Sequence, residues 1–136
     1  MSTIIADNLT GKTSAGSVTV TSEGGSATQS LQQGLSKAWV NFTSQTTTSV
    51  RDSFNHSSIT DNGTGDASIT ITSAMANTNF THLGMGGFGT TSQIAICQQR
   101  GSHAPTTTVS RYQLAYADTA LFDAAFGGVG LLGDLA

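Results

Sequence analysis

The sequence predicts an all-β protein, an antiparallel and jelly-roll-like β-sandwich over residues 37–136 that follows an extended N-terminal arm over residues 1–36. Three observations predict it. The 136 residues include 22 Thr and 17 Ser but only 10% charged residues, and threonine favours strands while keeping their outer faces polar. Short runs that alternate apolar and polar residues recur, separated by Gly, Asn and Asp. The large apolar residues are concentrated after Leu35, which places the core there.

Composition excludes several classes of protein. Glycine does not recur at every third position and there is one proline, so the chain is not a collagen. Cys97 is the single cysteine, which excludes a disulfide scaffold. Five basic residues and a net charge of -3 exclude a surface that follows nucleic-acid phosphates. The sequence contains no apolar run of about 20 residues, so it predicts no helix that spans a membrane.

The N-terminal zone, residues 1–36, alternates only in SVTVT (17–21), where Val18 and Val20 share one strand face. Such a segment cannot build a core alone, so we expect an extended arm that gains order by pairing with another chain or with another part of the assembly. Residues 28–34 then predict a two-turn helix with Thr28 as its N-cap. Leu31 in this helix and Leu35 directly after it are expected to pack either on the open edge of the same domain or against identical subunits.

The first predicted strand is KAWVNF (37–42), in which Trp39 lies on one face and Val40 and Phe42 lie on the other. Residues 61–66, DNGTGD, predict the turn of a hairpin. Further strands are predicted at SVRDSF (49–54), with Val50, Asp52 and Phe54 on one face, at ASITIT (67–72), with Ile69 and Ile71 on one face, and at NFTHLGM (79–85), SQIAIC (92–97), VSRYQLAY (109–116) and GVGLLG (128–133).

Residues 119–136 are the most apolar part of the chain. Leu121, Phe122, Ala125 and Phe126 predict a helical turn before the closing strand. Apolar segments of this kind mark contact surfaces, so the last leucines are expected within the domain or between subunits. The candidate residues for subunit contacts are Val18, Val20, Leu31, Leu35, Val129, Leu131, Leu132 and Leu135.

The sequence predicts no enzyme, cofactor or metal site. The GxSxG motif of a nucleophilic serine is absent, and none of His56, His82 and His103 lies in a catalytic motif. Asp61 and Asp66 bracket the predicted hairpin turn, where carboxylates cap backbone N–H groups more readily than they bind calcium. A glycan hydrolase, the enzyme alternative, needs two carboxyl groups across a sugar-sized cleft, and the sequence singles out no such pair.

Two further features are predicted to be structural. The glycine cluster LGMGGFG (83–89) lacks the lysine and the following helix of a phosphate loop, so it predicts a flexible loop or a strand bulge. Cys97 is predicted to be a small buried residue on a strand and not a nucleophile.

Carbohydrate recognition stays open, because aromatic rings beside hydroxyl and amide donors suit a sugar, and loops at one end of a sandwich can present them. The alternative places both tyrosines in the core with their hydroxyl groups hydrogen-bonded. The candidate glycan contacts are Phe88, Arg100, His103, Tyr112 and Tyr116, with Gln98 and Gln99 as polar neighbours.

Three segments carry a resemblance to a known family: LQQGLSKAWVNF (31–42), SVRDSFNHSSITDNGTGDASITITSAMANTNF (49–80) and LLGDLA (131–136). Together with the start MSTI and GKTSAG (11–16), they resemble short structural proteins of tailed bacteriophages, particularly marine and cyanobacterial ones, described as tail-fibre, fibre-like or knob-like virion proteins. The resemblance is most specific between Leu31 and Phe80.

The resemblance implies a virion protein, assembled in the host cytoplasm, whose N-terminal arm is anchored to tail or capsid proteins. Its β domain projects outward, commonly as a homotrimer, and contacts a host surface glycan. The alternatives are a capsid-decorating (cement) protein that stabilises the head and a free-standing sugar-binding module. The family motif names no catalytic or binding residue.

Overall fold

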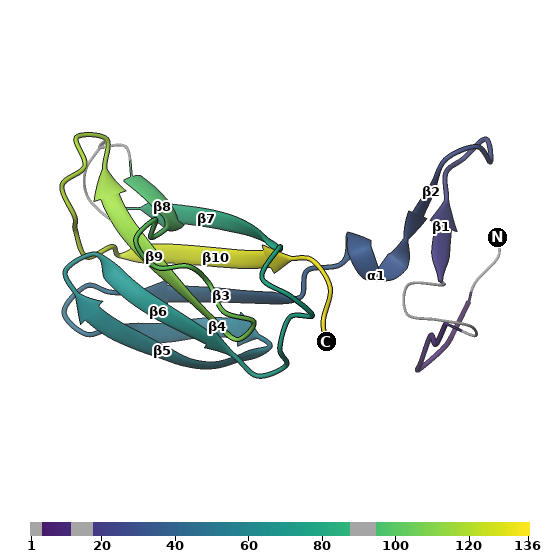
Figure 1. Cartoon of the computed structure of the whole chain (residues 1–136), viewed down its shortest axis with the longest axis horizontal. Helices are drawn as coiled ribbons and strands as arrows, with labels where there is room; N and C mark the ends of the chain where they lie inside the picture. Colours follow the sequence, from purple (N-terminus) through teal and green to yellow (C-terminus); the bar gives the residue numbers. More distant parts are fainter. Residues whose placement is uncertain (1–3, 12–17, 88–94) are drawn as a thin grey trace. The chain divides into compact units, whose positions relative to one another are not determined.

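A computed structural model describes residues 4–11, 18–87 and 95–136 (Figure 1). The chain divides into an N-terminal unit, residues 1–35, and a C-terminal unit, residues 36–136, one residue before the predicted boundary. The described part is all-β with antiparallel sheets, as the sequence predicts, apart from one helix of four residues.

The N-terminal unit contains one small sheet, in which β1 (Thr19–Thr21) pairs antiparallel with β2 (Thr28–Ser30). The structure pairs this segment with the neighbouring strand of its own chain, and its pairing with another chain or another part of the assembly stays a prediction. None of the described residues of this unit is buried, and Val20 is exposed. The unit therefore has no core of its own among these residues.

α1 (Leu31–Gly34) is a single turn, so the prediction of two turns is wrong. Thr28 lies in β2 and is not the N-cap. Ser30 takes that place, and its hydroxyl accepts a hydrogen bond from the Gln33 N–H at 3.4 Å. Pairing with β1 keeps the residues before Leu31 extended, which removes the first turn of the predicted helix.

The C-terminal unit contains two four-stranded antiparallel sheets (Figure 1). The first, the β10 sheet, consists of β4 (Ser49–Phe54), β3 (Ala38–Thr43), β10 (Phe126–Leu132) and β7 (Thr81–Gly87), in that spatial order. The second, the β9 sheet, consists of β5 (His56–Gly63), β6 (Asp66–Ile71), β9 (Val109–Tyr116) and β8 (Ala95–Gln99), in that spatial order. Both sheets contribute buried side chains to one core, which is consistent with a β-sandwich.

The connections depart from the predicted jelly-roll-like order. Three of them, β3–β4, β5–β6 and β8–β9, are hairpins that keep consecutive strands in one sheet, unlike the two Greek keys of a jelly roll. The predicted hairpin at residues 61–66 is confirmed, since Gly63 pairs with Asp66 across Thr64 and Gly65. Gly65 has a φ of +63°, which glycine adopts without strain.

The faces of β3 are as predicted, because Val40 and Phe42 are buried while Trp39 is 38% exposed. The prediction for β4 is wrong. A bulge shifts the register, so that Val50 pairs with buried Phe42 whereas Phe54 pairs with exposed Trp39. The extra residue of a bulge reverses the alternation of faces, so Val50 and Phe54 lie on opposite faces.

The strand predicted at residues 79–85 is present as β7, which extends to Gly87. The prediction of a flexible loop or a strand bulge for residues 83–89 is therefore wrong as far as Gly87, and residues 88 and 89 lie outside the described residues. Gly84 approaches the backbone of Cys97 on β8 so closely that a Cβ there would lie 2.1 Å from its carbonyl oxygen. The glycine is therefore needed for the close contact between the edge strands of the two sheets.

The segment before β10 does not form the predicted helical turn. Phe122 is buried with its ring stacked on Tyr116 at 4.3 Å between centroids, and Leu121 bridges to Ala115 in an extended conformation. Phe126 already belongs to β10. Contacts with a neighbouring strand, which no local pattern reveals, hold this segment extended.

The predicted subunit contacts separate into two groups. Val129 and Leu131 are buried in the core of their own domain, which confirms the first of the two predicted alternatives for them, so the prediction of a subunit contact at these two residues is wrong. The remaining candidates are at least partly exposed, namely Val18, Val20, Leu31, Leu35, Leu132 and Leu135.

Asn55 connects β4 to β5 with a φ of +53°. Its Nδ2 donates to the carbonyl oxygens of Lys37 and Ser73 at 2.9 and 3.1 Å, and its Oδ1 accepts from the Ser73 N–H at 2.7 Å. We expect Asn55→Ala to lower the free energy of unfolding by about 2–3 kcal/mol, because these bonds are lost and alanine is strained at positive φ. Asn55→Gly removes the same hydrogen bonds but adds no strain, so its loss of unfolding free energy, measured by urea unfolding, should be about 1 kcal/mol smaller than that of Asn55→Ala. Equal losses would contradict the role given to the backbone.

Candidate functional site

The main polar cluster of the described residues lies around Asp66, at the start of β6. Arg111 on β9 donates from Nε to Oδ1 and from Nη2 to Oδ2 of this carboxylate, both at 2.7 Å. Arg100 also donates from Nη1 to Oδ2. Asp66 is only 6% exposed, whereas both guanidinium groups remain partly exposed.

Strand pairing brings these residues together from distant parts of the sequence. Arg111 pairs with Ser68, and Asp66 lies two residues from Ser68 on the same strand. Residues two apart on a strand share a face, so Asp66 and Arg111 both lie on the outer face of the β9 sheet. Arg100 directly follows β8, and its N–H donates to the Arg111 carbonyl oxygen at 2.8 Å, which places it beside Arg111.

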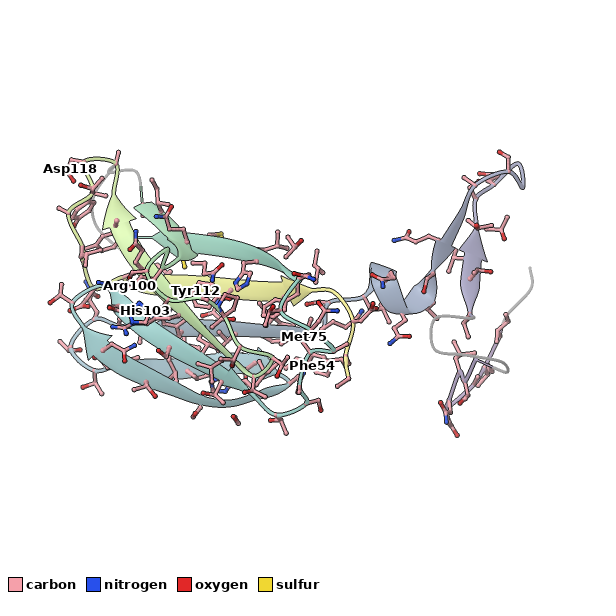
Figure 2. The ribbon with its side chains drawn as sticks, viewed as in Figure 1. Phe54, Met75, Arg100, His103, Tyr112 and Asp118 are labelled. Atoms are coloured by element: carbon pink, nitrogen blue, oxygen red, sulfur yellow. The ribbon has the colours of Figure 1, made fainter. Side chains whose placement is uncertain are left out.

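His103 completes the cluster from the loop after β8, and Figure 2 shows it next to Arg100. Its Nε2 lies 2.7 Å from Nη1 of Arg111, and its Nδ1 lies 3.0 Å from Oγ of Ser102. A guanidinium only donates, so Nε2 accepts and the hydrogen-bond network assigns the proton to Nδ1. Gln99 holds the loop by donating to the His103 carbonyl oxygen at 3.3 Å.

The cluster carries an excess of positive charge, because two guanidinium groups share one carboxylate. The hydrogen bond from Arg111 lowers the pKa of Asp66; burial opposes this shift, and the positive charges of Arg100 and Arg111 reinforce it. Asp66 is therefore ionised at neutral pH. The arrangement fixes both arginines in place and leaves part of each accessible to an anionic group, such as the carboxylate of an acidic sugar.

The structure brings together two of the predicted glycan contacts, Arg100 and His103, and separates the tyrosines from them. Tyr112 is 0% exposed, and its hydroxyl lies 2.8 Å from Nδ1 of His82, so the prediction of a glycan contact at Tyr112 is wrong. Burial raises the pKa of Tyr112. Tyr116 is partly buried against Phe122. Phe88 lies outside the described residues.

Asp66 and Arg111 are the cluster residues that the sequence analysis missed. Asp66 was predicted only as a turn residue, and its ion-pair partner lies 45 positions away. The alternation of VSRYQLAY (109–116) carries a signal, because it places Arg111 on the face opposite Tyr112. No signal in the sequence shows that Asp66 and Arg111 pair.

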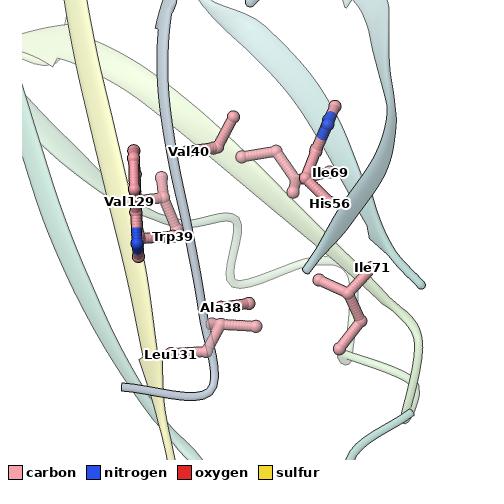
Figure 3. Close-up of a pocket in the computed structure, with 8 residues that line it drawn as sticks. All are labelled: Ala38, Trp39, Val40, His56, Ile69, Ile71, Val129 and Leu131. Carbon is pink, nitrogen blue, oxygen red and sulfur yellow. The ribbon is translucent and has the colours of Figure 1, made fainter. Parts of the chain in front are cut away.

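A small cavity lies between the two sheets, where Figure 3 shows the residues that line it. Its volume is about 10 Å³, which is no more than one water molecule needs. Aliphatic side chains such as Val40, Ile69 and Leu131 form most of the lining, together with His56. The cavity is therefore a packing defect and not a site for a ligand.

Cys97 is buried on β8, as predicted. Burial raises the pKa of its thiol to about 12, and a hydrogen bond to the backbone of Met85 opposes this only partly. We expect the folded protein to resist alkylation by iodoacetamide at pH 8, because only the thiolate reacts. Mass spectrometry should find one alkylated cysteine after unfolding in urea and none before it. Rapid labelling of the folded protein would contradict this assignment.

Within residues 4–11, 18–87 and 95–136, no three His, Cys, Asp or Glu side chains group as metal ligands would. No helix in this part of the chain has the length and hydropathy needed to cross a bilayer. Comparison with protein-family models, curated proteins and solved structures gives no match for the chain.

Proposed function

We propose that this chain is a structural protein of a bacteriophage virion, a short fibre- or knob-like appendage assembled as a homotrimer in the host cytoplasm. The N-terminal unit anchors the chain to other virion proteins, and the C-terminal unit is displayed for contact with the host surface. The resemblance of residues 31–80 to such proteins supports the family. The contrast between the two units supports the division of labour.

That contrast is the observation that carries the proposal. The C-terminal unit has a core to which both sheets contribute, whereas none of the described residues of the N-terminal unit is buried. Ile4, Ile5 and Leu9 are exposed, Ile5 by 92%. Apolar side chains in a segment without a core are stabilised when another protein covers them. An anchor that gains its order on the particle fits these residues.

The charged cluster favours contact with an acidic glycan as the second candidate function, that of a sugar-binding module. Arg100 and Arg111 outnumber the carboxylate of Asp66, and His103 lies beside Arg111 on the exposed loop that also carries Arg100. A glycan array tests this function. The proposal is supported if the wild-type chain binds uronic-acid or sialic-acid glycans and Arg100→Ala weakens this binding at least tenfold. The absence of binding to every glycan on the array would contradict it. A capsid-decorating (cement) protein is the third alternative; it would stabilise the head, and its location on the particle distinguishes it from an appendage.

Incorporation into particles tests the virion function. We expect mass spectrometry of purified particles of the phage that encodes the chain to find it in a fixed ratio to the other structural proteins. The double variant Ile4→Asp, Ile5→Asp should lower incorporation at least tenfold, because charge opposes apolar docking. Thr10→Asp, in the same segment, is the matched control. A chain that is abundant in infected cells but absent from particles would overturn the proposal.

A further inference from the structure

The outer face of the β10 sheet contains a groove that runs along its central strand. Val129 and Leu131 point into the core, so Gly128 and Gly130, which alternate with them, face outward and provide a floor without side chains. The groove has a volume of about 470 Å³. A Cβ at Gly130 would lie 3.7 Å from the Cβ of Leu83, an ordinary contact distance, so the floor can carry a side chain without a clash of that Cβ.

Large apolar side chains form the two walls of this groove. On β3, Trp39 pairs with Gly130; on β7, Leu83 pairs with Gly130 and Met85 pairs with Gly128. Met85 is 71% exposed. Leu83 and Met85 form a ridge directly beside the floor of Gly128 and Gly130. An apolar ridge and an apolar groove therefore lie next to each other on this face.

Exposed apolar side chains gather on this face of the C-terminal unit. Among its described residues, seven large hydrophobic side chains are exposed, and five of them lie here: Trp39, Phe54, Leu83, Met85 and Phe126. The outer face of the β9 sheet instead carries the charged cluster around Asp66. Aromatic residues and Met are enriched at the centre of protein interfaces, and charged residues are depleted there.

The apolar area of this face is large for a protein surface. Its five exposed apolar side chains offer about 500 Å² of accessible surface, in the upper part of the roughly 300–600 Å² that the largest apolar patch of a typical monomer covers, and such patches are often functional. A standard interface buries about 800 Å² on each partner, and the polar residues along the rim supply the difference. The rim also carries both signs of charge, with Arg51 stacked on Phe126 at 4.6 Å and Asp52 next to it in sequence.

We propose that this face binds a second copy of the chain, with the ridge formed by Leu83 and Met85 of one copy in the glycine groove of the next. A ridge that enters the groove of the next copy is a head-to-tail contact, and such a contact closes into a ring of three when successive copies are rotated by a third of a turn. The opposite charges of Arg51 and Asp52 at the rim suit pairing across this contact. The inference rests on the homotrimer of the proposed function and names the surface that forms it.

Sedimentation velocity and light scattering of the full chain between 1 and 100 µM test the proposal. We expect a species of three times the chain mass of 13.9 kDa. The double variant Leu83→Lys, Met85→Lys should weaken association at least 100-fold. Ile96→Lys, an exposed apolar residue on β8 of the other sheet, is the matched control and should leave the mass unchanged. Retained protection of Cys97 from alkylation shows that each variant is folded.

Two further measurements keep the outcome decisive. Trp39, the single tryptophan, lies on the wall of the groove, so its emission should shift to shorter wavelength as the wild-type chain associates. Gly130→Val fills the groove while adding apolar surface, so it should weaken association tenfold or more if shape matters. A trimer that persists in these variants overturns the surface and leaves the virion function intact. A wild-type monomer at 100 µM overturns the inference, and incorporation into particles then decides the virion function separately.

Discussion

Replacing Gly84 with alanine is expected to destabilise the C-terminal unit by about 3 kcal/mol, at the upper end of the usual cost of overpacking. The new Cβ would lie 2.1 Å from the carbonyl oxygen of Cys97 and 2.9 Å from its carbonyl carbon. Both are backbone atoms of β8, so no side-chain rotation relieves the clash. The edge strands of the two sheets must separate, and the buried contacts between them weaken.

Urea unfolding followed by the emission of Trp39 measures this loss. Gly87→Ala is the matched control, because it lies on the same strand and its new Cβ would meet Phe126 at an ordinary contact distance of 3.6 Å. We expect the control to change the free energy of unfolding by less than about 1 kcal/mol. Equal losses in the two variants would show that the cost comes from the strand conformation and not from the contact with Cys97.

Replacing Asp66 with asparagine is expected to lower the free energy of unfolding by about 2–3 kcal/mol. Breaking a buried ion pair costs more than this, but here both guanidinium groups are partly exposed, and water offsets part of the loss. The amide keeps the shape of the carboxylate but removes its charge and leaves Arg100 and Arg111 to repel each other. The loop that carries His103 should then become more mobile, since Arg111 also anchors that side chain.

The same carboxylate gives the protein a defined response to pH. The pKa of Asp66 in the folded protein is lowered from its ordinary value of 3.8. Its contribution to stability is therefore fully present above that value and is lost as the pH falls through the lowered folded pKa. Thermal unfolding between pH 7 and pH 2 should show a step below about pH 4 in the wild type that is absent in Asp66→Asn.

Asp118→Asn is the matched control for both measurements, because Asp118 is exposed and accepts a local hydrogen bond from the Ala120 N–H. It should keep the stability and the acid step of the wild type. An acid step of the same size in Asp66→Asn would assign the pH response to other carboxyl groups.

Local patterns in the sequence predicted the parts of the fold that depend on neighbouring residues. The alternation of VSRYQLAY gives β9 its observed bounds, and the turn residues at 61–66 give the β5–β6 hairpin. The burial of Val40 and Phe42 opposite exposed Trp39 also follows from alternation alone. In each of these cases, pairing with the neighbouring strand leaves the strand bounds, the turn or the buried face as the local pattern predicts them.

The wrong predictions fail where a distant strand decides the conformation. The glycines at 84, 86 and 87 favour a loop or a bulge over the strand that was also predicted at 79–85, yet β7 extends to Gly87 because β10 pairs with it, and β8 leaves no room for a side chain at Gly84. The bulge in β4 separates the faces of Val50 and Phe54, and it is fixed by the register with β3. Of the charged cluster, the sequence predicted the loop residues Arg100 and His103, but it missed the pairing of Asp66 with Arg111 across two strands.

The pairing of β3 with β10 has a consequence for how the protein is made. Trp39 on β3 pairs with Gly130, some ninety positions later, and β10 also separates β3 from β7 in the sheet. A nascent chain from which β10 has not yet emerged lacks this middle strand, so β3 and β7 have no partner on their facing edges. Completion of the sheet, and burial of the residues beneath it, must therefore wait until β10 has emerged from the ribosome.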